Sequence, residues 1–322
     1  MERKKALSVG GRLLVSAAML AVLVAKAPSF DPGDLLPTWS RASALWLGLA
    51  ALLTLAGIVL SAIRWQKVLE ALDIHTGLPR LVDHCLAGQF VSNVLPTTIG
   101  GDVLRVSRLA RDTGEPPGTF ASVVLERLTG WLVLPVITVA GFALNPGLRE
   151  LGRATGVALA LAGGTLILLV VVLAAAGSSR LGGRFASRSG WQGFLGAVHL
   201  GVDRLRHRPA AAANVLVAGL AYQLALVVAA VSVAQALGLR PAGLTALLAF
   251  FPAVLIAQVL PISMSGLGVR EGAFVLFLGP LGVPHSEAIA LGLVLYLLNL
   301  GVSLLGAPAF AVGGHRQPPL VA

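Results

Sequence analysis

The sequence has few charged side chains for its length, and this shortage decides the class of protein. Only 12% of its 322 residues are Asp, Glu, Lys or Arg, whereas 56% are hydrophobic. A water-soluble chain of this size needs more polar side chains to cover its surface. The composition therefore excludes a water-soluble globular protein and predicts an all-α integral membrane protein that crosses the bilayer several times.

Disulfides and the common enzyme motifs are also missing. Cys85 is the single cysteine, so no internal disulfide forms and the fold depends on helix packing. No lysine follows a Gly-x4-Gly spacing, and neither H-E-x-x-H nor G-x-S-x-G occurs. The sequence predicts no metal, no cofactor and no catalytic residue, and we expect the chain not to be an enzyme.

Negative charge is scarce as well, because 14 acidic residues stand against 24 Lys and Arg. A net charge of +10 can indicate a nucleic-acid-binding protein. Here the basic residues fall in short connections between apolar runs, where they set membrane orientation and attract anionic lipid headgroups. We therefore expect membrane lipids as partners and no nucleic acid.

Six segments have the length and apolarity needed to cross about 30 Å of hydrocarbon. The first is 1–27, whose basic head (Arg3, Lys4, Lys5) suits a cytoplasmic N-terminus; a cleaved signal peptide is the alternative, because "AKAP" resembles a cleavage site. The other five are 42–63, 119–144, 155–176, 210–238 and 287–312.

Two further apolar segments, 81–95 and 244–260, are marginal in length, and each runs into a proline followed by glycines. If both enter the membrane and return to the same side, sixteen Lys and Arg fall on the cytoplasmic side and six on the other. Arg64 is counted among the sixteen, as part of a cytoplasmic connection. The positive-inside rule then places both termini in the cytoplasm, and we expect a multi-pass protein of the bacterial cytoplasmic membrane.

These two segments also match each other. "VSNVLPTTIGGDVLR" (91–105) aligns without a gap with "IAQVLPISMSGLGVR" (256–270), at a constant offset of 165 residues. Three full spans separate the two segments, so the second enters from the opposite face and the repeat is inverted, a plan typical of transporters. Chance similarity between short Leu- and Val-rich strings is the alternative. The predicted chain is one membrane domain, 1–322, with repeat halves 42–176 and 207–312 and a basic cytoplasmic loop, 177–209.

Broken helices at membrane depth leave backbone groups unsatisfied unless protein or a wet cavity covers them. Pro96 and Pro261 are expected to end the incoming helices. Glycines follow the prolines and allow close backbone approach, and the helices after them direct their positive ends at an anion. Arg105 and Arg270 stand one turn into those helices, with Asp102 and Glu271 as natural ion-pair partners.

These residues carry a resemblance to a known family. "NVLPTTIGGDVLR", "SVVLERLTG" (122–130) and "LPISMSGLGVREG" (260–272) are similar to the motifs of the lysylphosphatidylglycerol synthase transmembrane family, the flippase-like domain of the multiple-peptide-resistance-factor proteins. The resemblance implies a lipid-translocating membrane domain over about residues 10–312. Ten residues follow Val312, so we expect no soluble aminoacyl-transferase domain and no lysyl transfer. The candidate substrate-binding residues are Asn93, Gly100, Gly101, Asp102, Arg105, Glu126, Arg127, Gly266, Gly268, Arg270 and Glu271.

Several polar residues have two interpretations. Glu126 and Arg127 either snorkel to the interface or face a cavity, and Asp83 and His84 are either hydrated at the interface or coupled to proton movement. The 177–209 loop is either an orientation-setting connection or a helix in the headgroup plane. If the broken segments share one cavity, Asp102 or Glu126 should pair with Arg270, and Glu271 with Arg105 or Arg127. Arg105 and Arg270 should then open on one polar pocket.

The predicted function is transport of an anionic phospholipid or lipid-linked headgroup between leaflets. A membrane-embedded lipid-modifying transferase, with Asp102, Glu126 or Glu271 as base, is one alternative. The other is a non-catalytic partner of an envelope glycosyltransferase or synthase, docked through the 177–209 loop. The inverted repeat and the lack of a donor-binding motif favour transport.

Overall fold

The computed structural model describes residues 14–23, 25, 40–94, 100–177, 191–259, 263 and 265–312, and the regular structure in these ranges is entirely helical. A short helix, Leu14–Leu23, comes first. The first half then contains α2 (Arg41–Ala71), α3 (Leu78–Val94), α4 (Gly100–Thr113), α5 (Pro116–Leu144), the 3-10 turn η2 (Pro146–Glu150) and α6 (Arg153–Gly177). The second half contains α7 (Trp191–Arg206), α8 (Pro209–Ala236), α9 (Leu244–Gln258), α10 (Val269–Leu278), the 3-10 turn η4 (Gly279–Leu281), α11 (His285–Leu304) and α12 (Gly306–Val312).

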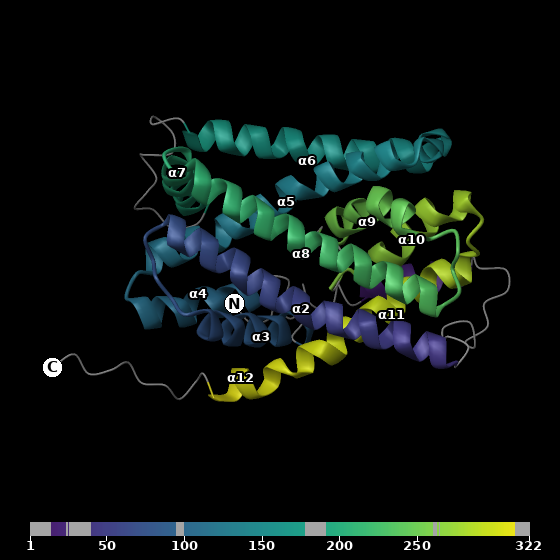
Figure 1. Ribbon diagram of the computed structural model, residues 1–322, viewed down its shortest axis with the longest axis horizontal. Helices are drawn as coiled ribbons and strands as arrows, with labels where there is room; N and C mark the ends of the chain where they lie inside the picture. The colour runs from purple at the N-terminus through teal and green to yellow at the C-terminus, as the bar shows by residue number, and fades with distance from the viewer. Residues whose placement is uncertain are drawn as a thin grey trace.

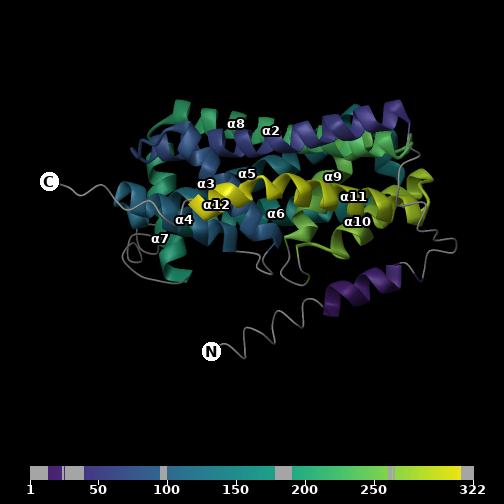
Figure 2. The ribbon, with the colours of Figure 1, turned by 90° about the horizontal axis from the view of Figure 1, so that it is seen from below.

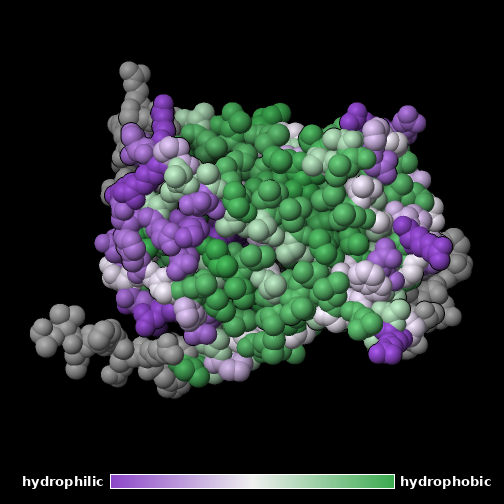
Figure 3. Space-filling model, in the orientation of Figure 1, coloured by the Kyte–Doolittle hydropathy of each residue, from purple (hydrophilic) through white to green (hydrophobic). Residues whose placement is uncertain are grey.

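Five segments of the described chain are long and apolar enough to cross a membrane: Arg41–Ala71, Pro116–Leu144, Arg153–Ala176, Pro209–Ala236 and His285–Val312. They confirm the five spans expected after the first one. The sixth, 1–27, lies mostly outside the described residues, which include only a helix of ten residues there, Leu14–Leu23. An apolar band runs across the middle of the molecule between two polar ends (Figure 3), as expected of a multi-pass membrane protein.

The short helices form two pairs. α3 packs against α4 and α9 packs against α10; the first pair lies toward the α7 end of the molecule and the second toward the opposite end (Figure 1). These helices have 17, 14, 15 and 10 residues. At 1.5 Å per residue they reach roughly 15–26 Å, too short to cross the hydrocarbon alone. Pro96 and Pro261, the expected helix stops, lie outside the described residues.

The two halves are held together by long antiparallel helices. α2 and α8 pack along each other and lie side by side in both ribbon views (Figures 1 and 2). α5 of the first half packs on α9, and α11 and α12 of the second half pack on α3. The main apolar core is built where α5, α6, α8, α9, α10 and α11 meet, and includes stacked Phe250 and Phe277.

Two glycines allow the closest of these contacts. A Cβ on Gly141 of α5 would collide with the backbone of Ala249 in α9, and a Cβ on Gly306 would collide with the backbone of Leu86 in α3. Gly141 and Gly306 are 165 positions apart, the same offset as between the aligned segments 91–105 and 256–270. Each of these glycines, in α5 and α12, thus lies where its helix meets a short helix that is distant in sequence, α9 or α3.

Candidate functional site

In the hairpin of α3 and α4, the two helices contact each other at glycines. A Cβ on Gly101 would collide with the side chain of Ser92 and with the carbonyl of Gly88. A Cβ on Gly88 would in turn lie 3.0 Å from Cγ and Cδ of Arg105. The glycines therefore let α4 lie close to α3 and direct Arg105 across α3 toward the interior.

Arg105 belongs to a buried charge cluster, made of Arg64, Arg105 and Glu126. Nη2 of Arg105 lies 2.6 Å from Oε2 of Glu126, and Nη2 of Arg64 lies 2.6 Å from Oε1. Ser61 donates a hydrogen bond of 3.1 Å to Oε1. The three charged residues are only 1–6% exposed. Two guanidinium groups share one carboxylate, so the cluster carries one net positive charge in an apolar setting.

Two aromatic rings cover the arginines. The guanidinium of Arg105 lies 4.2 Å from the ring centroid of Trp65, and that of Arg64 lies 4.7 Å from the ring of Tyr222. Trp65 is fixed by a hydrogen bond of 2.8 Å from its Nε1 to Oγ of Ser122. Such ring faces stabilise a cation where water is absent. The buried Nε atoms of Arg64 and Arg105 have no hydrogen-bond partner among the described residues.

A second ion pair lies outside this cluster. Arg127 donates to both carboxylate oxygens of Asp102, at 3.0 Å and 2.8 Å, and its side chain is 52% exposed. Asp102 also approaches Nη1 of Arg105 at 3.6 Å. Glu126 thus points into the protein and Arg127 toward its surface, as neighbours about 100° apart on a helix must.

The second hairpin holds a smaller cluster. Nε and Nη2 of Arg270 donate to Oε1 of Glu271, at 3.1 Å and 2.9 Å. The backbone amide of Gly268 donates to Oε2 at 2.6 Å, so Glu271 also caps the first turn of its own helix. Gly268 has a φ of 85°, and a Cβ on it would lie 2.7 Å from Cβ of Met19. The ring of Tyr296 faces Arg270 at 5.3 Å.

The expected ion pairs between the halves are not formed. The buried arginines pair with other carboxylates, Arg105 with Glu126 and Asp102, and Arg270 with Glu271. The prediction that Asp102 or Glu126 pairs with Arg270, and Glu271 with Arg105 or Arg127, is therefore wrong. The physical reason is local: Glu271 stands at the third position of α10, where its own helix amides and the adjacent guanidinium already satisfy it.

Neutral side chains link the halves instead. Nε2 of Gln89 donates to Oδ1 of Asn299 at 2.8 Å, and Nδ2 of Asn93 approaches the same oxygen at 3.4 Å.

Among the other candidates, Gly100 begins α4. Gly266 has a φ of 76°, and a Cβ on it would lie 2.8 Å from Cβ of Gln258, next to the break in the second hairpin. Gly101 and Gly266, 165 positions apart, each lie where the second arm of a hairpin contacts the first.

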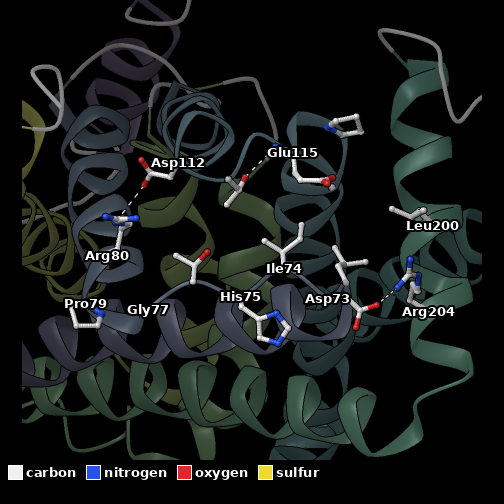
Figure 4. A pocket seen from close by; sticks show the side chains of 15 residues that line it. Asp73, Ile74, His75, Gly77, Pro79, Arg80, Asp112, Glu115, Leu200 and Arg204 are labelled. Carbon is white, nitrogen blue, oxygen red and sulfur yellow. Dashed lines mark hydrogen bonds and ion pairs between the residues drawn. The ribbon is translucent and has the colours of Figure 1, made fainter. Parts of the chain in front are cut away.

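The polar end near α7 contains a cavity of about 920 Å³ (Figure 4). Arg80 lies on one wall, 3.7 Å from Asp112, and Asp73 faces Arg204 on the other. Behind Asp112, Nε2 of buried His84 lies 3.0 Å from the same carboxylate. His84 is thus held inside the protein, whereas the neighbouring Asp83 is exposed. Hydration and proton coupling at Asp83 and His84 both stay predictions.

The part of the basic loop that the structure describes forms α7, which crosses the other helices at the polar end (Figures 1 and 2). Asp73, in the turn after α2, forms ion pairs with Arg204 at the end of α7 and with Arg208 just before α8. These two arginines lower the pKa of Asp73 below its usual range. Asp73 therefore ties α7 to the end of α2.

Sequence reasoning missed Arg64, which it assigned to a cytoplasmic connection. In the structure α2 continues to Ala71, and Arg64 lies buried within it, beside Trp65. The pattern Ser61, Arg64, Trp65, Val68 keeps a helical spacing beyond the apolar run and was the available signal. Arg108, also assigned to the cytoplasmic side, is buried; it donates to the carbonyls of Ala309 and Phe310 and so caps the end of α12.

Comparison with known proteins identifies the family. A family model for the lysylphosphatidylglycerol synthase TM region matches residues 11–306. The chain belongs to this family.

Two curated relatives share parts of this sequence. The chain is 27% identical over 136 residues to UPF0104 membrane protein PH1989 of Pyrococcus horikoshii. This match covers 41% of this chain and 39% of the relative. It is 26% identical over 333 residues to Glycosyltransferase AglD of Haloferax volcanii. This second match covers 92% of this chain and 53% of the relative. The chain thus spans about half or less of the length of these relatives.

Proposed function

We propose that this protein moves an anionic phospholipid or lipid-linked headgroup between the two leaflets, without catalysing a chemical reaction. The observation that carries the proposal is the cluster of Arg64, Arg105 and Glu126, which is almost fully buried and keeps one net positive charge. Buried charge at membrane depth is costly and is usually retained for function. An anionic headgroup would neutralise this excess, and the two unpartnered Nε–H groups are donors of the kind that a phosphate accepts.

The architecture supports the same function. We propose that the chain is an inverted repeat with two re-entrant hairpins, α3–α4 and α9–α10, entering from opposite faces. The antiparallel packing of α2 on α8 and the matched glycines Gly141 and Gly306 support this. Transporters of this plan bind substrate near the midplane, between broken helices. The headgroup would pass between the hairpins while its acyl chains stay in the bilayer.

The orientation follows from the charges at the two ends. The end of the molecule with the cavity carries Arg80, Arg111, Arg204 and Arg208, which the sequence analysis counts on the cytoplasmic side. We therefore assign this end to the cytoplasm by the positive-inside rule. Both termini would then be cytoplasmic. In this assignment α7 lies along the cytoplasmic headgroup region, where its basic residues attract anionic lipid.

The similarity to AglD favours one second candidate. That relative is named a glycosyltransferase, and the similarity covers 53% of it. The chain would then serve as the membrane part of a glycosyl-transfer or envelope-synthesis system, either as a partner of such an enzyme or in moving a lipid-linked sugar. Transfer chemistry by Asp102, Glu126 or Glu271 is less favoured, because each carboxylate is already engaged by arginine.

Reconstitution into liposomes tests the proposal. Fluorescent phosphatidylglycerol, phosphatidic acid and phosphatidylcholine are placed in the inner leaflet, and their appearance outside is followed by dithionite quenching. We expect exchange of the anionic probes well above that in empty liposomes and above that of phosphatidylcholine. Protein that moves no anionic probe faster than empty liposomes, in membranes with and without a pH gradient, would contradict the proposal. Sugar-modified lipid probes separate the second candidate from the first.

A further inference from the structure

One face of α11 carries a line of small and polar residues. Gly292, Tyr296, Asn299 and Ser303 are spaced by four, three and four residues, so they lie on one side of the helix. On a membrane-spanning helix such a face contacts other protein or water, because lipid disfavours polar groups. Leu297, next to Tyr296 in sequence, is 61% exposed and lies on the lipid side.

This face of α11 touches both hairpins in turn. A Cβ on Gly292 would lie 2.9 Å from Cγ of Glu271, and the ring of Tyr296 faces Arg270. Three residues further along, Asn299 accepts hydrogen bonds from Gln89 and Asn93 of α3. At 1.5 Å per residue, Gly292 and Asn299 are about 10 Å apart along the helix.

At its other end this line contacts α3, the helix that packs on Arg105 through Gly88. Gln89 follows Gly88, the glycine whose missing side chain leaves space for Arg105. Along α11 the polar contacts thus run from Arg270 at Tyr296 to the amides of α3 at Asn299. Tyr296, Asn299, Gln89 and Asn93 are all partly exposed, although they belong to a membrane-spanning helix or to a hairpin packed on one.

We propose that the Tyr296–Asn299 face of α11 is the middle of the path along which the headgroup passes between Arg105 and Arg270. This inference rests on the proposed function and names the residues that such transport uses between its two charged ends. A phenol and three carboxamides offer donors and acceptors but no charge. They hydrogen-bond a phosphate without holding it as tightly as an arginine, which suits a step that has to release its substrate.

Thiol labelling tests the path without requiring transport. Asn299→Cys and Leu297→Cys are made in a Cys85→Ser background and treated in liposomes with a membrane-impermeant sulfonatoethyl methanethiosulfonate. Arg111→Cys, exposed at the polar end, is the positive control. We expect Asn299→Cys to be modified and Leu297→Cys to stay unmodified. Dihexanoyl phosphatidylglycerol should slow the modification of Asn299→Cys, and dihexanoyl phosphatidylcholine should not.

An Asn299→Cys variant that resists the reagent, or that reacts without protection by phosphatidylglycerol, overturns the path even if the native protein moves lipid. Modification with protection, in a protein that moves no lipid, keeps the headgroup site and removes the transport proposal. The two failures are therefore distinguishable.

Charge substitution gives a second, independent test. Asn299→Asp should slow phosphatidylglycerol exchange by about tenfold or more, because a like charge in the path repels the headgroup, whereas Asn299→Lys should slow it far less. A purely structural role for Asn299, as the acceptor of the hydrogen bond from Gln89, would impair Asn299→Lys more than Asn299→Asp, because a carboxylate still accepts that bond and an ammonium cannot. Equal loss in the two variants, or a larger loss in Asn299→Lys, therefore contradicts the path, and Leu297→Ala should leave the exchange rate unchanged.

Discussion

Arg105 and Arg270 are aligned at the offset of 165 residues that relates segments 91–105 and 256–270, yet they are neutralised differently. Arg105 depends on Glu126 of another helix, and it shares that carboxylate with Arg64. Arg270 pairs with the next residue in sequence, which also caps its helix. The first cluster is therefore built by tertiary structure and keeps a net positive charge, whereas the second is local and neutral. The difference places the stronger attraction for an anion in the first half.

The largest effect is expected from Glu126→Gln, because it leaves two buried arginines without their shared carboxylate. We expect a loss of about 3–5 kcal/mol in folding stability. Thermal unfolding in detergent, followed by the fluorescence of a core tryptophan, measures it. Glu70→Gln is the matched control: it breaks a surface pair with Lys67, and we expect a loss of less than about 1 kcal/mol. Equal losses of folding stability in the two variants would mean that the buried cluster does not stabilise the packing between its helices.

The matched glycines give a smaller effect that sharpens the comparison. Gly141→Ala and Gly306→Ala each force a Cβ into the backbone of the opposite half, so each should cost about 1–3 kcal/mol, and to a similar extent. Gly156→Ala, whose Cβ meets nothing within 4 Å, should have no such cost. The same unfolding assay compares the three. A large loss in only one of the pair would contradict the equivalence of the two halves.

Removing one of the two clustered arginines should disturb stability less than removing their carboxylate. Arg64→Gln leaves Glu126 paired with Arg105, so we expect a loss of about 1 kcal/mol, the scale of one hydrogen bond. The net charge of the cluster then falls to zero, and phosphatidylglycerol exchange should fall with it. A stable Arg64→Gln protein with unchanged exchange would show that the excess charge is not used.

Asp73→Asn should have the smallest effect, because the carboxylate and its partners are exposed at the polar end. Arg208 and Arg204 lower the pKa of Asp73, so its contribution is present at neutral pH and is lost as the pH falls through that lowered value. Protease cleavage within 177–209, compared at pH 7 and in acid, reports the loosening of α7. We expect faster cleavage in Asp73→Asn at pH 7 and no difference in strong acid. Identical cleavage at pH 7 would show that Asp73 does not hold α7.

The sequence predicted the parts of the fold that depend on local composition. Apolar runs of about 20 residues gave five of the spans, because hydrocarbon thickness fixes their length. The glycines after each break were expected to allow close backbone approach, and Gly101 and Gly266 do so. Asn93 and Glu126 were named as candidates and face other polar groups. Whether they bind substrate is still a prediction.

The pairing within the site could not be predicted from sequence in the same way. Arg64 was misplaced because α2 stays helical past the end of its apolar run, supported by packing against other helices. Glu271 was expected to reach the other half, although the pattern Gly-x-x-Glu at 268–271 already resembled a helix cap. The contact of Asn299 with Gln89 joins residues 210 positions apart and follows only from how α11 packs on α3.

The most direct test of the central claim compares phosphatidylglycerol exchange in liposomes containing the native protein, Arg105→Gln or Arg270→Gln. We expect both variants to insert and purify normally and to exchange lipid at the rate of empty liposomes, with partial recovery in Arg105→Lys, which lacks the planar two-point grip on a phosphate. Native exchange rates in both glutamine variants would contradict the assignment of these arginines to an anionic headgroup.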